Sequence, residues 1–331
     1  MGRLPFALIC LAACAVPASA IVVPTIADET AFGVSYTSPV IDGIDLNGVV
    51  QVRSSRGGCS GALLADGFSI LTAGHCVASS YAAGAVSASV GLLTSGSSGM
   101  SFTNAAMVFV NPGWTGDATQ GGDLAVIRLP SAAPSQYTRY NLFTGTPSTG
   151  VDVIAGYGYT GTGSAGYTSG TYGTLRAGNN RYEEYGSAVS WSANLLLGDF
   201  DNGTVTNNAF CWAFDNTDWQ NGTCSAYFSD TDVSHEVMIA PGDSGGPTFQ
   251  NGYLIGVHDM GACFTSASIC AQPPSVISAN QSAFGQFFAD TSVSAYASWI
   301  QSQEVPEPAS CALALAGLLL LGLVRVRRRT C

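Results

Sequence analysis

The 331-residue sequence contains no lysine, only three histidines, and few charged residues of any kind, 10% in all. Its 11 basic residues are therefore all arginine, and four of them lie within the last seven positions. Residues 21–303 carry 6 arginines against 20 acidic residues, a net charge of −14. Because phosphate contacts depend on lysine and arginine, this balance argues against nucleic acid as a partner. Solubility is sufficient to explain the acidity.

Metal-binding patterns are also scarce. The sequence has no Cys-x-x-Cys pair and no histidine at ligand spacing, which argues against a zinc site. The acidic turn D-F-D-N-G, from Asp199 through Asp201 to Gly203, is similar to the start of a calcium loop. The remaining ligands and the closing glutamate are not at the required spacing, so a plain turn is favoured and calcium is the alternative. The sequence predicts no cofactor and no metal.

The N-terminus has the features of a secretory signal peptide. Arg3 precedes an apolar run, Leu4–Val16, and the small residues Ala18-Ser19-Ala20 follow. A basic start, an apolar middle and an A-x-A end predict export, with cleavage after Ala20. Residues 21–47 then form an acidic, proline-containing N-terminal segment.

Residues 304–331 combine a V-P-E-P sequence, an apolar run at Cys311–Val324 and an arginine-rich end. The run is shorter than the ~20 residues that a membrane-spanning helix needs. This arrangement resembles the PEP-CTERM sorting signal of Gram-negative bacteria. The resemblance implies that membrane sorting machinery is a partner of the tail and that the protein is secreted or held at the cell surface. An ordinary C-terminal membrane anchor, with its basic end in the cytoplasm, is the alternative.

Six of the 10 cysteines lie in the predicted exported body. An even number in an exported protein predicts disulfides, although six cysteines allow many connectivities. The six are Cys59, Cys76, Cys211, Cys224, Cys263 and Cys270.

Short strand-like segments separated by glycine-rich turns recur along the chain, which predicts an all-β sandwich or barrel. An Asp-Gly pair at Asp66-Gly67 predicts a hairpin within Ser60–Leu71. The interval 159–235 has no clear periodicity. Further strands are expected at 48–53, 85–93, 101–110, 123–129, 151–158 and 254–261.

The most informative stretch is Pro241–Pro247, which reads P-G-D-S-G-G-P. Glycines let a turn bring backbone N–H groups close to a ligand, and a serine on such a turn can act as a nucleophile beside oxyanion donors. A glycine-rich surface turn that happens to contain a serine is the alternative. A serine nucleophile needs a base, and His75 in L-T-A-G-H-C and Asp123 in D-L-A-V-I-R-L lie earlier in the chain.

These three segments resemble the histidine, aspartate and serine segments of the chymotrypsin/trypsin family, in the order that this family has. The resemblance covers roughly residues 48–301. It implies two six-stranded antiparallel Greek-key barrels of the chymotrypsin type, with a boundary near 135–150 and a short C-terminal helix around Tyr296–Gln301. We take 48–303 as the protease domain.

The resemblance also implies roles for individual residues. Ser244 would be the nucleophile, His75 the general base and Asp123 the residue that orients His75, while the N–H groups of Gly242 and Ser244 would form the oxyanion hole. The family has a disulfide that corresponds to Cys59–Cys76. For the remaining four cysteines we predict sequential pairing, Cys211–Cys224 and Cys263–Cys270.

Two departures from the family pattern affect the site. In the family, the aspartate at Asp243 pairs with a freshly cut N-terminus, but no lysine or arginine occurs between Arg3 and Arg53 to be cut. Ile21 would become the terminus after signal cleavage, further upstream than the family spacing. Asp259 stands where the family usually has serine, and a second carboxylate there would favour the protonated form of His75.

Substrate preference is suggested by four positions. By the spacing of the family that the chain resembles, the base of the specificity pocket would lie at Met238, where trypsin-like enzymes have aspartate, so cleavage after arginine or lysine is disfavoured. Gly261 and Gly285 would leave the pocket open, which favours an apolar residue before the scissile bond. His258 resembles a histidine of glutamate-specific bacterial relatives, so an acidic preference is the competing interpretation. A third interpretation is that His258 packs in the core and does not contact the substrate.

Two functions from different classes follow. The first is an exported, monomeric serine endopeptidase that acts on protein or peptide substrates. The second is a catalytically silent, surface-displayed binding protein on the same fold.

Overall fold

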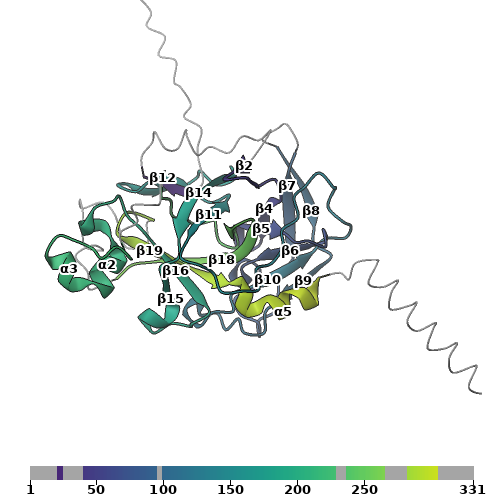
Figure 1. Ribbon diagram of the computed structural model, residues 1–331. Helices are drawn as coiled ribbons and strands as arrows, with labels where there is room; N and C mark the ends of the chain where they lie inside the picture. Colours follow the sequence, from purple (N-terminus) through teal and green to yellow (C-terminus); the bar gives the residue numbers. More distant parts are fainter. Residues whose placement is uncertain (1–20, 25–39, 95–98, 229–235, 265–281, 305–331) are drawn as a thin grey trace, which may run out of the picture.

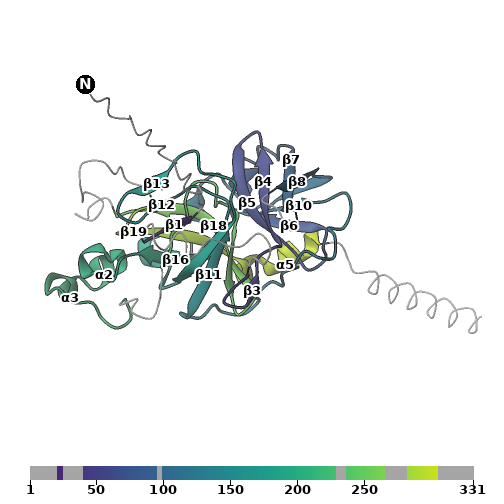
Figure 2. The same cartoon turned by 90° about the horizontal axis from the view of Figure 1, so that it is seen from above.

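The computed structural model describes residues 21–24, 40–94, 99–228, 236–264 and 282–304. Two curled antiparallel sheets of seven strands each lie side by side (Figures 1 and 2). The predicted all-β fold of two antiparallel barrels with a short C-terminal helix is confirmed. The strand count differs, because each sheet has seven strands where we expected six.

The first sheet runs in the order β8-β7-β4-β5-β6-β10-β9, so that β8 and β9 are its two edges. Only Ala105 and Ala106 separate these edge strands along the chain. With about 3.8 Å between successive Cα atoms, so short a link requires the two edges to lie close together, which closes the sheet into a barrel. The predicted single strand at 101–110 is thus one bent segment that pairs at both edges, which accounts for the seventh strand. The strands are β4 (Val49–Ser54), β5 (Gly57–Leu63), β6 (Ser69–Thr72), β7 (Ala88–Leu93), β8 (Met100–Asn104), β9 (Met107–Val110) and β10 (Ala125–Arg128).

The second sheet closes in the same way, in the order β14-β11-β17-β18-β19-β16-β15. Its edges β14 and β15 are joined by Tyr182 and Glu183 alone. The strands are β11 (Val151–Gly156), β14 (Arg176–Arg181), β15 (Glu184–Tyr185), β16 (Leu195–Phe200), β17 (Pro247–Gln250), β18 (Tyr253–Ala262) and β19 (Gln286–Ser292).

Two small sheets accompany the barrels. β1 (Ile21–Val23) pairs in parallel with β12 (Thr160–Thr162), which also pairs with β13 (Gly166–Thr168). β2 (Val40–Ile41) and β3 (Ile44–Asp45) form a hairpin. The three residues of β1 are buried, so the segment directly after the predicted signal peptide is part of the folded core.

The interval 159–235, which lacked periodicity, contains short helices as well as strands. The helices α2 (Ala209–Phe214) and α3 (Asn216–Gln220) project from the end of the second barrel that is remote from the first (Figures 1 and 2). Asn208 caps α2 by accepting a hydrogen bond from the Cys211 N–H. Both helices are too short for a hydrophobic period to reveal them. The described residues also form four 3₁₀ helices: η1 (Gly74–Cys76), η2 (Ala118–Gln120), η3 (Gly186–Val189) and η4 (Val205–Asn207).

The C-terminal helix α5 (Val293–Gln303) leaves the second barrel and packs on the first (Figure 1). Val293 and Ile300 are fully buried in the same core cluster as the side chains of the first barrel. Burial of such side chains is worth roughly 1.5–3 kcal/mol each, so the helix stabilises the contact between the barrels.

Two of the predicted disulfides are present, Cys59–Cys76 and Cys211–Cys224. Cys263 is also disulfide-bonded, and its predicted partner Cys270 lies outside the described residues. Among the described residues, no helix is long and apolar enough to cross a membrane. Apart from Glu304, the predicted sorting tail lies outside the described residues.

Candidate active site

His75 and Asp123 approach one another because the strands that carry them are paired. His75 lies on η1, three residues after β6 ends, and Asp123 lies two residues before β10 begins. β6 and β10 are antiparallel neighbours in which Thr72 faces Ala125. The turn from β6 into η1 therefore points toward the segment that enters β10.

The two side chains form a tight pair. Asp123 Oδ2 lies 2.5 Å from the ring Nδ1 of His75, and Asp123 Oδ1 accepts the backbone N–H of His75 at 2.6 Å. Asp123 is fully buried, whereas the imidazole is partly exposed. Burial opposes ionisation of Asp123, but the charge and hydrogen bonds of His75 outweigh it and hold the pKa of the carboxyl below its usual value. The pair can hold the Nδ1–H tautomer, which leaves Nε2 free as a base.

Ser244 comes from the second barrel, on the turn that precedes β17, and its side chain is half-buried. Its carbonyl oxygen accepts the N–H of Ser60 at 2.9 Å. The same oxygen lies 3.6 Å from Cys76 Sγ, in the disulfide directly after His75. The structure thus brings the predicted nucleophile turn against the segment that carries the predicted base.

Ser60 of the first barrel connects the two barrels at this point through hydrogen bonds. Its hydroxyl donates to the Gly242 carbonyl and accepts the Tyr157 N–H, both at 2.9 Å. Its carbonyl accepts the hydroxyl of Thr72 at 2.7 Å. Ser60 is fully buried, and its partners hold the nucleophile turn on both sides of Asp243. Sequence reasoning missed this residue, since a serine in a strand carries no signal of such a role.

The shape of the nucleophile turn depends on two glycines. Gly242 and Gly245 have φ angles of +98° and +80°. A Cβ at Gly245 would lie 2.1 Å from Thr72 Oγ1 and 2.5 Å from the Ser60 carbonyl oxygen. Within the described part of the chain, the N–H groups of Gly242 and Ser244 donate to no protein oxygen. An oxyanion hole requires N–H groups that have no such protein acceptor.

Asp243 points inward and is fully buried. Its Oδ1 accepts the Gly158 N–H at 2.8 Å and its Oδ2 accepts the Ala240 N–H at 2.9 Å. Burial raises the pKa of Asp243 to about 6, against the lowering effect of these two hydrogen bonds.

The strand β1 lies beside both partners of Asp243. Ile21 pairs with Thr160, two residues after Gly158. Val22 exchanges two backbone hydrogen bonds with Met238, at 2.9 and 3.0 Å, two residues before Ala240. Ile21 also has a φ of +64°, which is a strained conformation for a β-branched residue. No sequence pattern predicts that β1 inserts at this position.

Two of the predicted pocket residues are neighbours. Met238 is fully buried, and a Cβ at Gly261 would lie 3.3 Å from Met238 Cε. Gly285 is bound through its N–H to the Phe200 carbonyl at 2.8 Å. The segment 265–281, between these two glycines, lies outside the described residues.

His258 is fully buried on β18. Its Nδ1 lies 3.1 Å from each carboxylate oxygen of Asp290, which also accepts the hydroxyls of Tyr182 at 2.5 Å and Thr248 at 2.6 Å. Burial opposes protonation of the imidazole, but the Asp290 carboxylate outweighs it and raises the pKa of His258. This geometry favours the core-packing interpretation of His258. Sequence reasoning missed Asp290, Tyr182 and Thr248.

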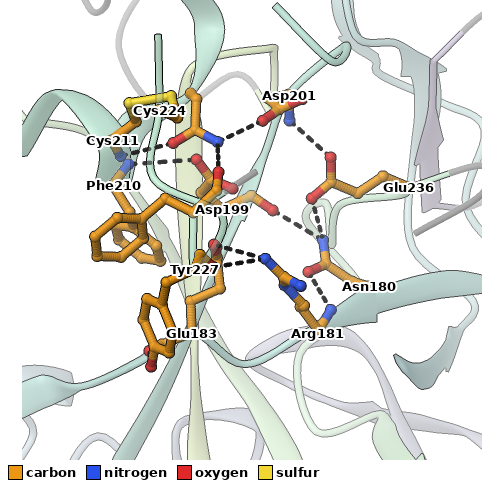
Figure 3. A network of polar contacts seen from close by, with 12 residues as sticks. Asn180, Arg181, Glu183, Asp199, Asp201, Phe210, Cys211, Cys224, Tyr227 and Glu236 are labelled. Carbon is orange, nitrogen blue, oxygen red and sulfur yellow. Dashed lines mark hydrogen bonds and ion pairs between the residues drawn. A yellow bond between two sulfur atoms is a disulfide. The ribbon is translucent and has the colours of Figure 1, made fainter. Parts of the chain in front are cut away.

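The acidic turn at Asp199 and Asp201 belongs to a buried polar network (Figure 3). Asp199 Oδ2 accepts the Ala209 N–H at the start of α2, at 2.7 Å. Asp201 accepts the Gly203 N–H and the Asn208 side-chain amide, at 2.5 and 2.7 Å. These N–H donors suit a turn and a helix cap. Neither aspartate belongs to a group of three potential metal ligands among the described residues.

A cavity of about 450 Å³ opens beside the nucleophile turn. Its lining includes Arg53, Gly58, Tyr159, Tyr172, Pro241 and Gly242.

We predict that Gly245→Ala destabilises the protein more than Gly252→Ala. Both glycines have a φ of +80°, so both variants incur the ~1–2 kcal/mol cost of a left-handed alanine. Only Gly245 faces atoms within 3 Å of the added carbon, since Gly252 has nothing within 4 Å, and such overpacking adds about 1–3 kcal/mol. Urea unfolding of the two variants measures the difference. Equal losses of unfolding free energy would mean that the nucleophile turn is not held tightly against Ser60.

Comparison with known proteins agrees with this geometry. The family model described as Trypsin matches residues 43–277, more than half of the chain. The model described as PEP-CTERM protein-sorting motif matches residues 304–329 and, together with the disulfides, indicates an exported protein. A search of the curated proteins finds none that matches the chain. The chain therefore belongs to the trypsin family and carries a PEP-CTERM sorting motif.

Proposed function

We propose that this protein is an exported serine endopeptidase that cleaves peptide bonds through an acyl-enzyme, with His75, Asp123 and Ser244 as its triad. The tight hydrogen bond between His75 Nδ1 and buried Asp123, on the segment against which the Ser244 turn packs, carries the proposal. It is supported by membership of the trypsin family. The protease domain would span 48–303, and the enzyme would act as a monomer.

In the proposed reaction, Ser244 Oγ attacks the substrate carbonyl carbon while its proton moves to His75 Nε2. The resulting imidazolium is stabilised by the Asp123 carboxylate. His75 then protonates the leaving amine, the C–N bond breaks, and the acyl group remains on Ser244. A water molecule repeats the sequence: it gives its proton to His75 and attacks the ester, and the proton returns to Ser244 Oγ.

The backbone N–H groups of Gly242 and Ser244 would hold the oxyanion that forms at each attack. Among the described residues, these N–H groups donate to no protein oxygen, which supports this role. A donor of this kind is worth about 3 kcal/mol of transition-state stabilisation in measured cases.

We expect Ser244→Ala to lose casein hydrolysis almost completely while its thermal unfolding stays unchanged, because only the nucleophilic oxygen is removed. Ser131→Ala, at an exposed position, is the matched control and should keep full activity. Hydrolysis by Ser244→Ala at the wild-type rate would refute the triad. If the wild-type enzyme itself is folded and inactive, the silent binding protein becomes the better assignment.

Specificity for an apolar residue before the scissile bond is the finer proposal. Met238 at the pocket base offers no charge to a basic side chain, so arginine or lysine would be buried without a partner. His258 has its Nδ1 against Asp290 and is fully buried, which gives little support to a direct contact with an acidic substrate.

A peptide library should therefore show cleavage after Phe, Tyr, Leu or Met, with arginine and lysine strongly disfavoured. The library is profiled for the wild type and for His258→Ala. A dominant glutamate signal that disappears in His258→Ala would overturn this preference in favour of the acidic one. Efficient cleavage after arginine would show that Met238 does not form the pocket base.

Activation is proposed to follow from signal cleavage after Ala20. The N-terminal end of β1 lies on the side of Gly158 and Ala240, so the ammonium group freed at Ile21 would lie near the Asp243 carboxylate. Cleavage would also relieve the positive φ of Ile21, because no preceding carbonyl would then remain. The ion pair would keep Asp243 charged and hold the turn that carries Gly242 and Ser244.

A chain that begins at Ser19-Ala20-Ile21 should have at least tenfold lower kcat/KM than one that begins at Ile21. In the extended chain the Asp243 pKa of about 6 exceeds the unfolded value of 3.8, so the folded state binds the proton more tightly. Its stability should therefore fall by about 2–3 kcal/mol as the pH rises from about 4 to about 6, and stay lower above that. The chain that begins at Ile21 should not show this loss. Urea unfolding across this range tests the proposal, and equal activity and pH dependence of the two chains would contradict it.

The tail at 304–331 is proposed to direct the protein to membrane sorting machinery and the surface of a Gram-negative cell. The match to the PEP-CTERM motif supports this destination.

A further inference from the structure

Asp259 places a second carboxyl group against the His75–Asp123 pair. It lies on β18 and is 5% exposed, while Asp123 is completely buried. One ligand atom each of His75, Asp123 and Asp259 lies within 4.8 Å of the other two. Two carboxylates this close in a buried site cannot both be ionised without a large electrostatic cost, which favours a state in which one of them keeps a proton.

The hydrogen bonds decide which carboxyl group keeps that proton. Asp123 accepts the backbone N–H of His75 and faces its ring Nδ1, and both contacts favour the ionised form. Asp259 accepts one hydroxyl, that of Thr291, at 3.2 Å on Oδ2. Its Oδ1 is buried and receives no hydrogen bond from the described residues. An oxygen in that position suits a protonated hydroxyl, which needs an acceptor instead of a donor.

We propose that Asp259 is held as the neutral carboxylic acid and donates a hydrogen bond to Asp123, which makes it a positioning residue for the His75–Asp123 pair. The proposal rests on the proposed function for its catalytic consequence. The neutral acid adds a third hydrogen bond to Asp123 without adding charge. The imidazolium formed during acylation then meets one carboxylate, which stays fixed in place.

The surroundings of Asp259 agree with the neutral form. The titratable groups that act on it are Asp123 from the first barrel and Asp290 from β19, and His75 lies nearby. Burial raises the pKa of Asp259 well above its usual value, and the negative charges of Asp123 and then Asp290 raise it further. If Asp259 is neutral, it adds no negative charge that would favour the protonated form of His75, so the proposal and the expectation from sequence predict different pH profiles.

The pH dependence of kcat/KM tests the proposal with three variants. Asp259→Asn and Asp259→Ser each keep a neutral donor, so their acid limbs should match the wild type within 0.3 pH units (a shift of about twofold), with rates within about fivefold. Asp259→Ala removes the donor and should lose about tenfold or more in kcat/KM. A charged Asp259 would stabilise the imidazolium in the wild type, so an acid limb that moves down by about one pH unit in Asp259→Asn would overturn the proposal. An Asp259→Ala variant as active as Asp259→Asn would overturn the positioning role.

An infrared difference spectrum tests the protonation state without any need for activity. Wild-type protein minus Asp259→Asn at neutral pH should show the C=O stretch of a protonated carboxylic acid. Carboxylate bands in its place would overturn the proposal, even if Asp259→Ala does not fold. The two proposals can fail separately. If the wild-type protein shows the carboxylic acid band but hydrolyses no substrate, the protonation of Asp259 is supported and the proposed function is refuted.

Discussion

The contact on which the site depends is the junction at Ser60. This buried serine belongs to the first barrel, yet its N–H and its hydroxyl both bind carbonyl groups of the nucleophile turn in the second. Its chain neighbour Cys59 is bonded to Cys76, directly after His75. One short segment therefore fixes the positions of the proposed base and the proposed nucleophile relative to each other. Two barrels that met only through apolar side chains would lack this directional constraint.

The ionisable groups around the junction differ in their exposure to solvent. His75 is partly exposed, while Asp123, Asp243 and Asp290 are completely buried. Each buried carboxylate has its own compensation: the hydrogen bonds of His75 for Asp123, two backbone N–H groups for Asp243, and His258 with two hydroxyls for Asp290. Asp259 has fewest donors, which is why we assign the shared proton to it. The chain has no lysine, and histidine side chains, backbone N–H groups and hydroxyls supply the compensation for these three carboxylates.

The residues that could be predicted from sequence are those that lie within short, recognisable motifs. The segments around His75, Asp123 and Ser244 predicted the fold, and the structure brings them together. The barrel strands were found because their turns and short apolar runs are visible in sequence. The seventh strand of each sheet was missed because closure depends on two-residue links, Ala105-Ala106 and Tyr182-Glu183. Each link joins two strands that pair at opposite edges of the same sheet. The insertion of β1 beside Met238 and the environment of Asp259 are long-range contacts, which no pattern within a segment encodes.

The central claim is that one serine, at the junction of the barrels, is chemically activated. Reaction of the exported protein with a fluorophosphonate, followed by proteolysis and mass spectrometry, tests this most directly. We predict a single phosphonyl adduct, on the peptide that contains Pro241–Pro247, at Ser244. An unmodified protein with intact Cys59–Cys76 and Cys211–Cys224 disulfides, or an adduct on a different serine, would contradict the account.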